Sequence, residues 1–222
     1  NQNELERTIA HEIGHNWFYG ALASNERKTP WLDEGLNTYY DRRYEKELLN
    51  VEQTVSGFLE KRWPQDVEKW LLGGIESIHA DQPITTPADS MNMANYGLVI
   101  YYKTAIWLEA LEKKLGTPLF DRCMREYYQK YRYSHVQPAD FQQVFESISG
   151  QQLTAFTQLS TSGPIEWEKR KKIQPAFLFN FSRAEEYRTV GFGPLLGYNK
   201  YDGFMICGFL YNYQLPVPRF CF

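Results

Sequence analysis

The pentapeptide His11-Glu12-Ile13-Gly14-His15 constrains this chain more than any other feature of its sequence. Each residue of an α-helix turns by about 100°, so residues four apart project from one face, one turn from each other. Two imidazoles held in this way can bind one metal ion, and zinc is the ion typical of this pattern. Glu12 lies about 100° around the helix from His11, close enough to address a water molecule on that metal. The pattern therefore predicts a helix that carries half of a zinc site.

A catalytic zinc site needs a third protein ligand and one open position. Glu34 is the candidate, within Trp31-Leu32-Asp33-Glu34-Gly35-Leu36, and eighteen residues separate it from His15. That gap fits the end of one helix, a loop and the start of a second, antiparallel helix. The alternatives are an exposed helix with two solvated histidines, and a first-turn glutamate favoured by the helix dipole. The joint spacing favours a site with His11, His15 and Glu34 as ligands.

Composition excludes several classes of protein. The net charge is −3 and the isoelectric point is about 5.9, so no global basic field recruits nucleic acid. No uninterrupted apolar run approaches the ~20 residues of a membrane-spanning helix.

Apolar spacing predicts a mainly α chain. After the helix of the zinc motif, a second helix is expected to begin near residues 31–33, and further helices are expected over 51–72, 98–115, 119–131, 138–148 and 153–159. Pro64 forces a break within the helix expected over 51–72.

The composition changes near residue 164. We expect a helical region over residues 1–164, a linker over 165–175 and a β-rich C-terminal segment over 176–222. The basic run Lys169–Lys172 is expected to be a solvated face of the linker. Strands are expected over 176–181, 187–198 and 204–213, where aromatic residues and glycines partly alternate.

The stretch Thr8–Trp17, followed by Trp31–Gly35, closely resembles the M1 family of zinc aminopeptidases. These gluzincins combine His-Glu-x-x-His with a glutamate after eighteen residues. The resemblance covers about residues 1–162 and implies the helical part of a thermolysin-like catalytic domain with one zinc ion. It implies hydrolysis of peptides from the amino end, with zinc-bound water as nucleophile and Glu12 as general base.

The family also uses a tyrosine, in a Tyr-x-Lys-Gly motif on a later helix, to stabilise the tetrahedral oxyanion. Tyr101-Tyr102-Lys103-Thr104 resembles this motif, with threonine in place of the glycine. Because Lys103 fixes the register, the resemblance assigns the role to Tyr101 rather than to Tyr102 or Tyr96. The alternative is that Tyr101 is an aromatic residue of the core.

One family motif is missing from the chain. The exopeptidase motif Gly-x-Met-x-Asn lies upstream of the zinc motif and would precede Asn1, and Met91–Asn95 lacks its glycine and follows the zinc motif. We therefore expect the chain to be a fragment of a large bacterial member of the family. A thermolysin-type endopeptidase, an inactive zinc-holding scaffold and an epoxide hydrolase are the alternatives. An intact Glu12 argues against the scaffold.

The C-terminal segment resembles the extra region that follows the peptidase domain in large bacterial relatives. Two alternatives are open: membrane association through this region of the full-length protein, or a small soluble β module that packs on the helices. Family analogy implies export to the periplasm or outer membrane of a Gram-negative bacterium. Side-chain preference and oligomeric state do not follow from the sequence.

Overall fold

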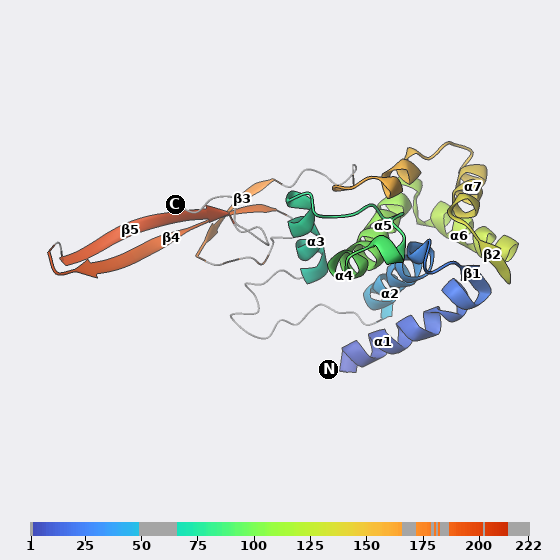
Figure 1. The fold of residues 1–222 in the computed structure, drawn as a ribbon, viewed down its shortest axis with the longest axis horizontal. Helices are drawn as coiled ribbons and strands as arrows, with labels where there is room; N and C mark the ends of the chain where they lie inside the picture. The colour runs from blue at the N-terminus through green and yellow to red at the C-terminus, as the bar shows by residue number, and fades with distance from the viewer. Residues whose placement is uncertain are drawn as a thin grey trace. The chain divides into compact units, whose positions relative to one another are not determined.

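The computed structural model describes residues 2–48, 66–165, 172–178, 180, 182, 187–201 and 203–212. The chain forms two compact units, Asn1–Glu52 with Asp81–Glu168, and Gln53–Ala80 with Lys169–Phe222. In its described residues the first unit is mostly helical, and the second holds a helix and a three-stranded sheet (Figure 1). The predicted mainly α fold with a small β-rich segment is confirmed. The predicted boundaries at 164 and 175 stay a prediction.

The described residues of the first unit form helices, short helical turns and one pair of short strands. In chain order these are α1 (Gln2–Gly14), the π-helical turn η1 (Asn16–Ala21), β1 (Leu22–Ser24), the 3-10 turn η2 (Pro30–Leu32), α2 (Glu34–Leu48), η4 (Ala88–Ser90), α4 (Met93–Asn95), the π-helical turn η5 (Tyr96–Lys103), α5 (Thr104–Leu115), α6 (Thr117–Tyr131), β2 (Ser134–Val136), α7 (Pro138–Ser149) and the 3-10 turn η6 (Thr154–Ser160). The short strands β1 and β2 pair in parallel.

Most helices predicted from apolar spacing are present in the first unit. The helices expected over 119–131 and 138–148 are α6 and α7, and the one over 98–115 is η5 continuing into α5. The segment 153–159 is a 3-10 helix rather than an α-helix. The expected helix over 51–72 and its break at Pro64 fall mainly on residues outside the described ranges.

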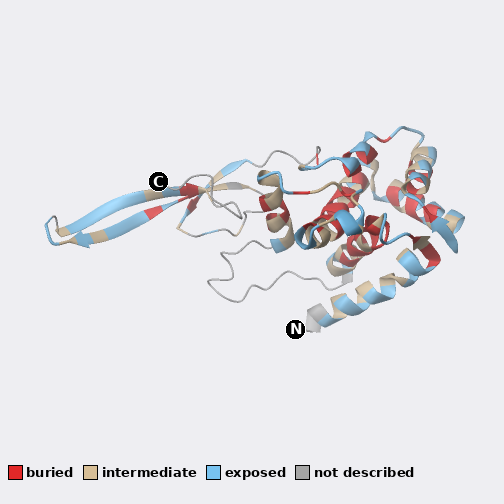
Figure 2. Cartoon of the chain, viewed as in Figure 1, coloured by how far each residue is buried: buried red, intermediate tan, exposed pale blue. Residues whose placement is uncertain are grey.

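An aromatic core holds the first unit together. Trp31 contacts Trp107 and Phe141 edge to face, with ring centroids 6.2 Å and 5.8 Å apart. The indole nitrogen of Trp107 donates a hydrogen bond of 3.0 Å to the Ala155 carbonyl. Figure 2 shows this burial concentrated in the helices of the unit. Because Trp31 and its neighbour Leu32 are fully buried, the core fixes the chain directly before α2 begins.

The second unit contains α3 (Val67–Ser77) and a sheet of β3 (Ile173–Phe177), β4 (Arg188–Asn199) and β5 (Gly203–Asn212). The strand order is β3-β4-β5, with β3 parallel and β5 antiparallel to β4. The two later strands confirm the prediction over 187–198 and 204–213. The first strand begins three residues earlier than expected and ends at Phe177, because it pairs with β4 only over that range.

The described part of the second unit buries few side chains. Trp70 of α3 and Tyr211 of β5 form a small apolar cluster, and the Tyr211 hydroxyl donates a hydrogen bond of 2.6 Å to the Leu178 carbonyl. Large apolar side chains of the β4–β5 hairpin, among them Leu196 and Phe204, are exposed, and most of the hairpin is coloured as exposed in Figure 2. Among the described helices, none combines the length and apolar content needed to cross a bilayer. The two alternatives for this segment stay predictions.

Helix α2 approaches η5 and α5 closely at Gly35. A Cβ atom added there would lie 2.6 Å from Thr104 Cβ and 2.8 Å from the Ile100 carbonyl oxygen. Thr104 stands where the resemblance has a glycine, and the absence of a side chain at position 35 leaves room for it. The residue after Glu34 therefore packs directly on the turn that carries Tyr101.

We expect Gly35→Ala to lower the free energy of unfolding by about 1–3 kcal/mol, because the new methyl group meets a backbone carbonyl that cannot move away cheaply. Denaturant unfolding of the full-length protein measures the change. Gly97→Ala is the matched control, since nothing lies within 4 Å of a Cβ there, and it should be neutral or stabilising by up to about 1 kcal/mol. Equal stability of the two variants would contradict the packing argument.

Candidate metal centre

The centre is built on two antiparallel helices. Arg7 of α1 pairs with Glu45 of α2 at 3.2 Å, and one turn further along α1 the Asn37 amide donates to the His11 carbonyl at 2.7 Å. A Cβ atom at Gly14 would collide with the Asn37 side chain. The glycine between the two histidines therefore allows the close approach of α1 and α2 that this hydrogen bond needs.

The side chains of His11 in α1, of His15 directly after α1 and of Glu34 in α2 point their ligand atoms at one place. Nε2 of His11 and Nε2 of His15 lie 3.2 Å and 3.5 Å from Oε2 of Glu34. The three ligand atoms all lie within 4.8 Å of one another, and this is the one such cluster of His, Cys, Asp or Glu found within the described residues. Two imidazole nitrogens and one carboxylate oxygen are the donor set of a catalytic zinc site.

Buried carboxylates hold the far side of both imidazole rings. Nδ1 of His11 lies 2.6 Å from Oδ2 of Asp41, and Nδ1 of His15 lies 2.8 Å from Oδ1 of Asp33. Both aspartates are buried. A carboxylate on Nδ1 fixes the ring orientation and leaves Nε2 for a metal ion, which is the usual arrangement behind metal-binding histidines. The residues therefore fit a zinc ion both in the atoms that would bind it and in the carboxylates that orient those ligands.

The cluster shifts the pKa values of its members. The hydrogen bonds to Asp41 and then to Glu34 raise the pKa of His11 to about 10, against the effect of burial. Burial raises the pKa of Asp33 to about 6, although His15 offsets part of this effect. Burial also acts to raise the pKa of Glu34, but hydrogen bonds from His11 and Tyr101 outweigh it and leave that pKa below its ordinary value. The site therefore favours an ionised Glu34 beside a positive charge.

The three candidate tyrosines have different partners. The hydroxyl of Tyr101 forms a hydrogen bond with Glu34, and its ring stacks on that of His11 at 6.1 Å. The hydroxyl of Tyr102 instead accepts a hydrogen bond of 3.1 Å from Arg7, and the ring of Tyr96 packs against Tyr101 at 6.0 Å. Tyr101 is therefore the tyrosine that shares a hydrogen bond with a candidate ligand.

Glu12 lies on α1 between His11 and His15, which directly follows the last residue of that helix, and the side chain of Glu12 is exposed. It has no hydrogen bond or ion pair to any other residue in the described part of the chain. An exposed carboxylate one residue from His11 is free to meet a water molecule or a substrate.

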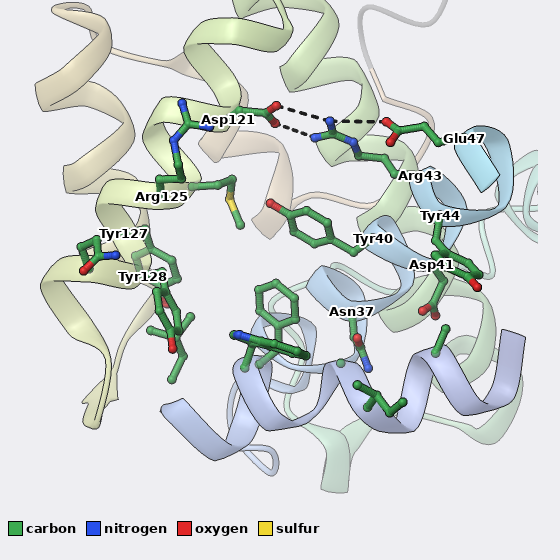
Figure 3. Close-up of a pocket in the computed structure, with 18 residues that line it drawn as sticks. Asn37, Tyr40, Asp41, Arg43, Tyr44, Glu47, Asp121, Arg125, Tyr127 and Tyr128 are labelled. Atoms are coloured by element: carbon green, nitrogen blue, oxygen red, sulfur yellow. Dashed lines mark hydrogen bonds and ion pairs between the residues drawn. The ribbon is translucent and has the colours of Figure 1, made fainter. Parts of the chain in front are cut away.

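A cavity of about 630 Å³ lies behind the centre, between α1, α2 and α6. Figure 3 shows Asn37 and Asp41 projecting from α2 toward α1, where they line one side of the cavity. At another side, the Arg43 side chain donates a hydrogen bond to Asp121. None of the described residues that line this cavity is a candidate ligand. Since Asn37 and Asp41 also contact His11, the cavity borders the supporting side of the cluster rather than the side where its ligand atoms converge.

Sequence reasoning missed Asn37 and the two supporting aspartates, although Asp41 had a readable signal. It follows Glu34 by seven residues, and two helical turns bring it back to nearly the same face of α2. Asp33 precedes the helix, so no helical spacing locates it. Its contact with His15 depends on how η2 enters α2.

Three comparisons relate the chain to known proteins. The model of the peptidase family M1 domain matches residues 1–159. Aminopeptidase M1-B of Oryza sativa subsp. japonica is 27% identical over 155 residues, which cover 68% of this chain and 17% of that protein. Aminopeptidase N of Lactococcus lactis subsp. lactis is 20% identical over 156 residues, which cover 70% of this chain and 18% of that protein. The chain thus spans less than a fifth of the length of these curated relatives.

Solved structures have the same fold. A mutant of the M1 zinc metallopeptidase of Deinococcus radiodurans, bound to a Tyr-Ser-Ala substrate, aligns with a TM-score of 0.52 and 18% identity over 72% of this chain and 34% of that one. Aminopeptidase A of Legionella pneumophila, in complex with aspartic acid, aligns with a TM-score of 0.52 and 16% identity over 95% of this chain and 20% of that one. At this level of identity the likeness concerns the fold.

We expect Asp41→Asn to weaken zinc binding by about 10- to 100-fold, because an amide holds the His11 ring less firmly and adds no basicity to it. Competition titration of the full-length protein against a chelator measures the affinity. Asp89→Asn, at an exposed position of η4, is the matched control and should bind zinc as the parent does. Equal affinities of the two variants would refute the supporting role of Asp41.

Proposed function

Because the chain belongs to peptidase family M1, we propose that it is the metal-binding part of a zinc peptidase that removes N-terminal residues from peptides. The observation that carries this proposal is the convergence of His11 Nε2, His15 Nε2 and Glu34 Oε2 within 4.8 Å. The backing of both rings by buried aspartates supports it. The names of the curated relatives, which are aminopeptidases, favour the amino end of the substrate as the site of cleavage.

His11, His15 and Glu34 would hold one zinc ion. When bound, zinc acts as a Lewis acid that lowers the pKa of water to about 7 and polarises a peptide carbonyl. Asp41 and Asp33 hold the Nδ1 atoms of the two imidazoles, which would leave both Nε2 atoms, facing Glu34, as ligands. The ionised state of Glu34, favoured by its lowered pKa, suits a ligand to a cation.

Glu12 would move the protons of the reaction. Its carboxylate takes a proton from the attacking water as the oxygen bonds to the carbonyl carbon, and returns that proton to the amine as the C–N bond breaks. One carboxylate can serve both steps because the acid formed in the first is the donor needed in the second. The exposure of Glu12 beside His11 supports this role.

Tyr101 would stabilise the oxyanion that forms on the carbonyl oxygen. Burial and then the hydrogen bond to Glu34 raise the pKa of its hydroxyl, so it stays protonated and remains a donor. One well-placed donor to an oxyanion contributes about 3–4 kcal/mol. Its hydrogen bond to Glu34 supports this placement, since Glu34 is itself a ligand in the proposal.

We expect Glu12→Gln in the full-length protein to retain zinc but to lose peptide hydrolysis, because the amide cannot accept the proton. Zinc content by elemental analysis and turnover of a peptide substrate are measured on the same sample. Glu6→Gln, on the same helix, serves as the control and should hydrolyse at the parent rate. Unchanged turnover of the Glu12 variant would refute its assignment as base.

A thermolysin-type endopeptidase is the second candidate, since it uses the same donor set and base. We expect the full-length protein to cleave peptides with a free amino terminus and to leave the same peptides intact after N-acetylation. Mass spectrometry of the products from each pair of peptides measures this. Equal cleavage of free and acetylated peptides would favour the endopeptidase, and binding of zinc without cleavage of either would favour a scaffold.

A further inference from the structure

The turn that carries Tyr101 is not an ordinary α-helical turn. Residues Tyr96–Lys103 form the π-helical turn η5. The Thr104 N–H donates to the Val99 carbonyl, five residues earlier, and the Thr104 hydroxyl reaches the same carbonyl at 3.2 Å. A π-turn is rare in proteins, as expected if it is less stable than an α-turn, and it is frequently found at functional sites. Its shape therefore needs support from the surrounding structure.

A buried ion pair supports this turn from the side away from the metal centre. Lys103 Nζ lies 2.7 Å from Asp81 Oδ2, and the two side chains are 1% and 0% exposed. The same carboxylate oxygen accepts a hydrogen bond of 2.6 Å from the Gly163 N–H. The Asp81 carboxylate thus contacts both the Gly163 backbone and the Lys103 ammonium.

Lys103 and Tyr101 point in roughly opposite directions. The ring of Tyr101 stacks on that of His11, whereas the Lys103 side chain is buried against Asp81, so one side chain faces the centre while the other enters the core. Tyr101 reaches Glu34, and Lys103 reaches Asp81. A movement of the lysine in the core would therefore move the tyrosine hydroxyl at the site.

Stability alone does not explain this pair. The free energy lost when two charges leave water offsets much of the free energy gained from their attraction. A protein with apolar residues of similar volume in place of the pair is often at least as stable. Asp81 Oδ1 is also buried without a hydrogen-bond partner among the described residues. A directional contact between fixed atoms, by contrast, sets a position in a way that an apolar contact does not.

We infer that Asp81 and Lys103 are positioning residues that hold η5 so that the Tyr101 hydroxyl stays within reach of Glu34 and of the substrate oxyanion. The effect on catalysis rests on the proposed function, in which Tyr101 stabilises the oxyanion. The claim that the ion pair sets the position of Tyr101 does not depend on that function. The pair acts through Tyr101 and touches neither the metal nor the substrate.

The test is the double variant Asp81→Asn with Lys103→Met in the full-length protein. The amide oxygen at position 81 can still accept the Gly163 hydrogen bond, and no buried charge is left unpaired, so the variant should fold. We expect kcat to fall about 10- to 100-fold, the loss typical of a misplaced group, with KM and zinc content unchanged. The control is Arg43→Met with Asp121→Leu, which removes another ion pair of the same unit and should leave kcat unchanged.

A double-mutant cycle separates positioning from general damage. In a Tyr101→Phe background the same pair of substitutions should lower kcat by no more than about twofold, since the group that it positions is already missing. An equal loss in both backgrounds, or no loss in the parent background, would overturn the inference.

A measurement without turnover separates this inference from the proposed function. 3-Fluorotyrosine at position 101 of the metal-free full-length protein should give one ¹⁹F line that shifts or broadens in the Asp81 and Lys103 variant and not in the Arg43 and Asp121 variant. An unchanged line in the first variant would overturn the inference even if the enzyme is active. A shifted line in a protein that hydrolyses no peptide would uphold the positioning and refute the proposed function instead.

Discussion

The contact between each histidine and a buried aspartate is the interaction on which the centre depends. His11 and His15 turn Nε2 toward Glu34 because Asp41 and Asp33 occupy their Nδ1 atoms at 2.6 Å and 2.8 Å. Without these carboxylates the two rings could rotate about their side-chain bonds, because the backbone alone fixes only the Cβ position of each histidine. The burial of both aspartates strengthens the contacts because little water competes for them.

Helix α2 joins these contacts to the rest of the unit. Its first residue is Glu34, and Asp41 lies two turns further on. Trp31 and Leu32 anchor the preceding turn in the aromatic core, and Gly35 lets the helix lie against η5. One short stretch of sequence thus brings together a candidate ligand, the support of another and the packing surface for Tyr101. A shift of this helix would change all three at once.

Local spacing predicted the part of the centre that lies on single helices. His11 and His15 are one turn apart, and this relation holds in any α-helix that contains them. Asp41 was readable by the same rule and was missed. Asp33, Asn37 and the Lys103–Asp81 pair were not readable, because each joins segments whose relative placement depends on packing. Apolar spacing predicts a short amphipathic helix over 153–159, but in so short a segment it hardly separates an α-helix from the 3-10 helix that Thr154–Ser160 forms.

The sequence by itself determined the donor types, their order along the chain and the family, since these follow from residue identity and from fixed helical periodicity. Only the tertiary structure decided which atoms meet: that Glu34 Oε2 faces both Nε2 atoms, that aspartates hold both Nδ1 atoms, and that the partner of the Tyr101 hydroxyl is Glu34. The physical reason is that a hydrogen bond or a metal site requires atoms to be placed within a few tenths of an ångström. Between segments far apart in the chain, the packing of the whole core sets such distances.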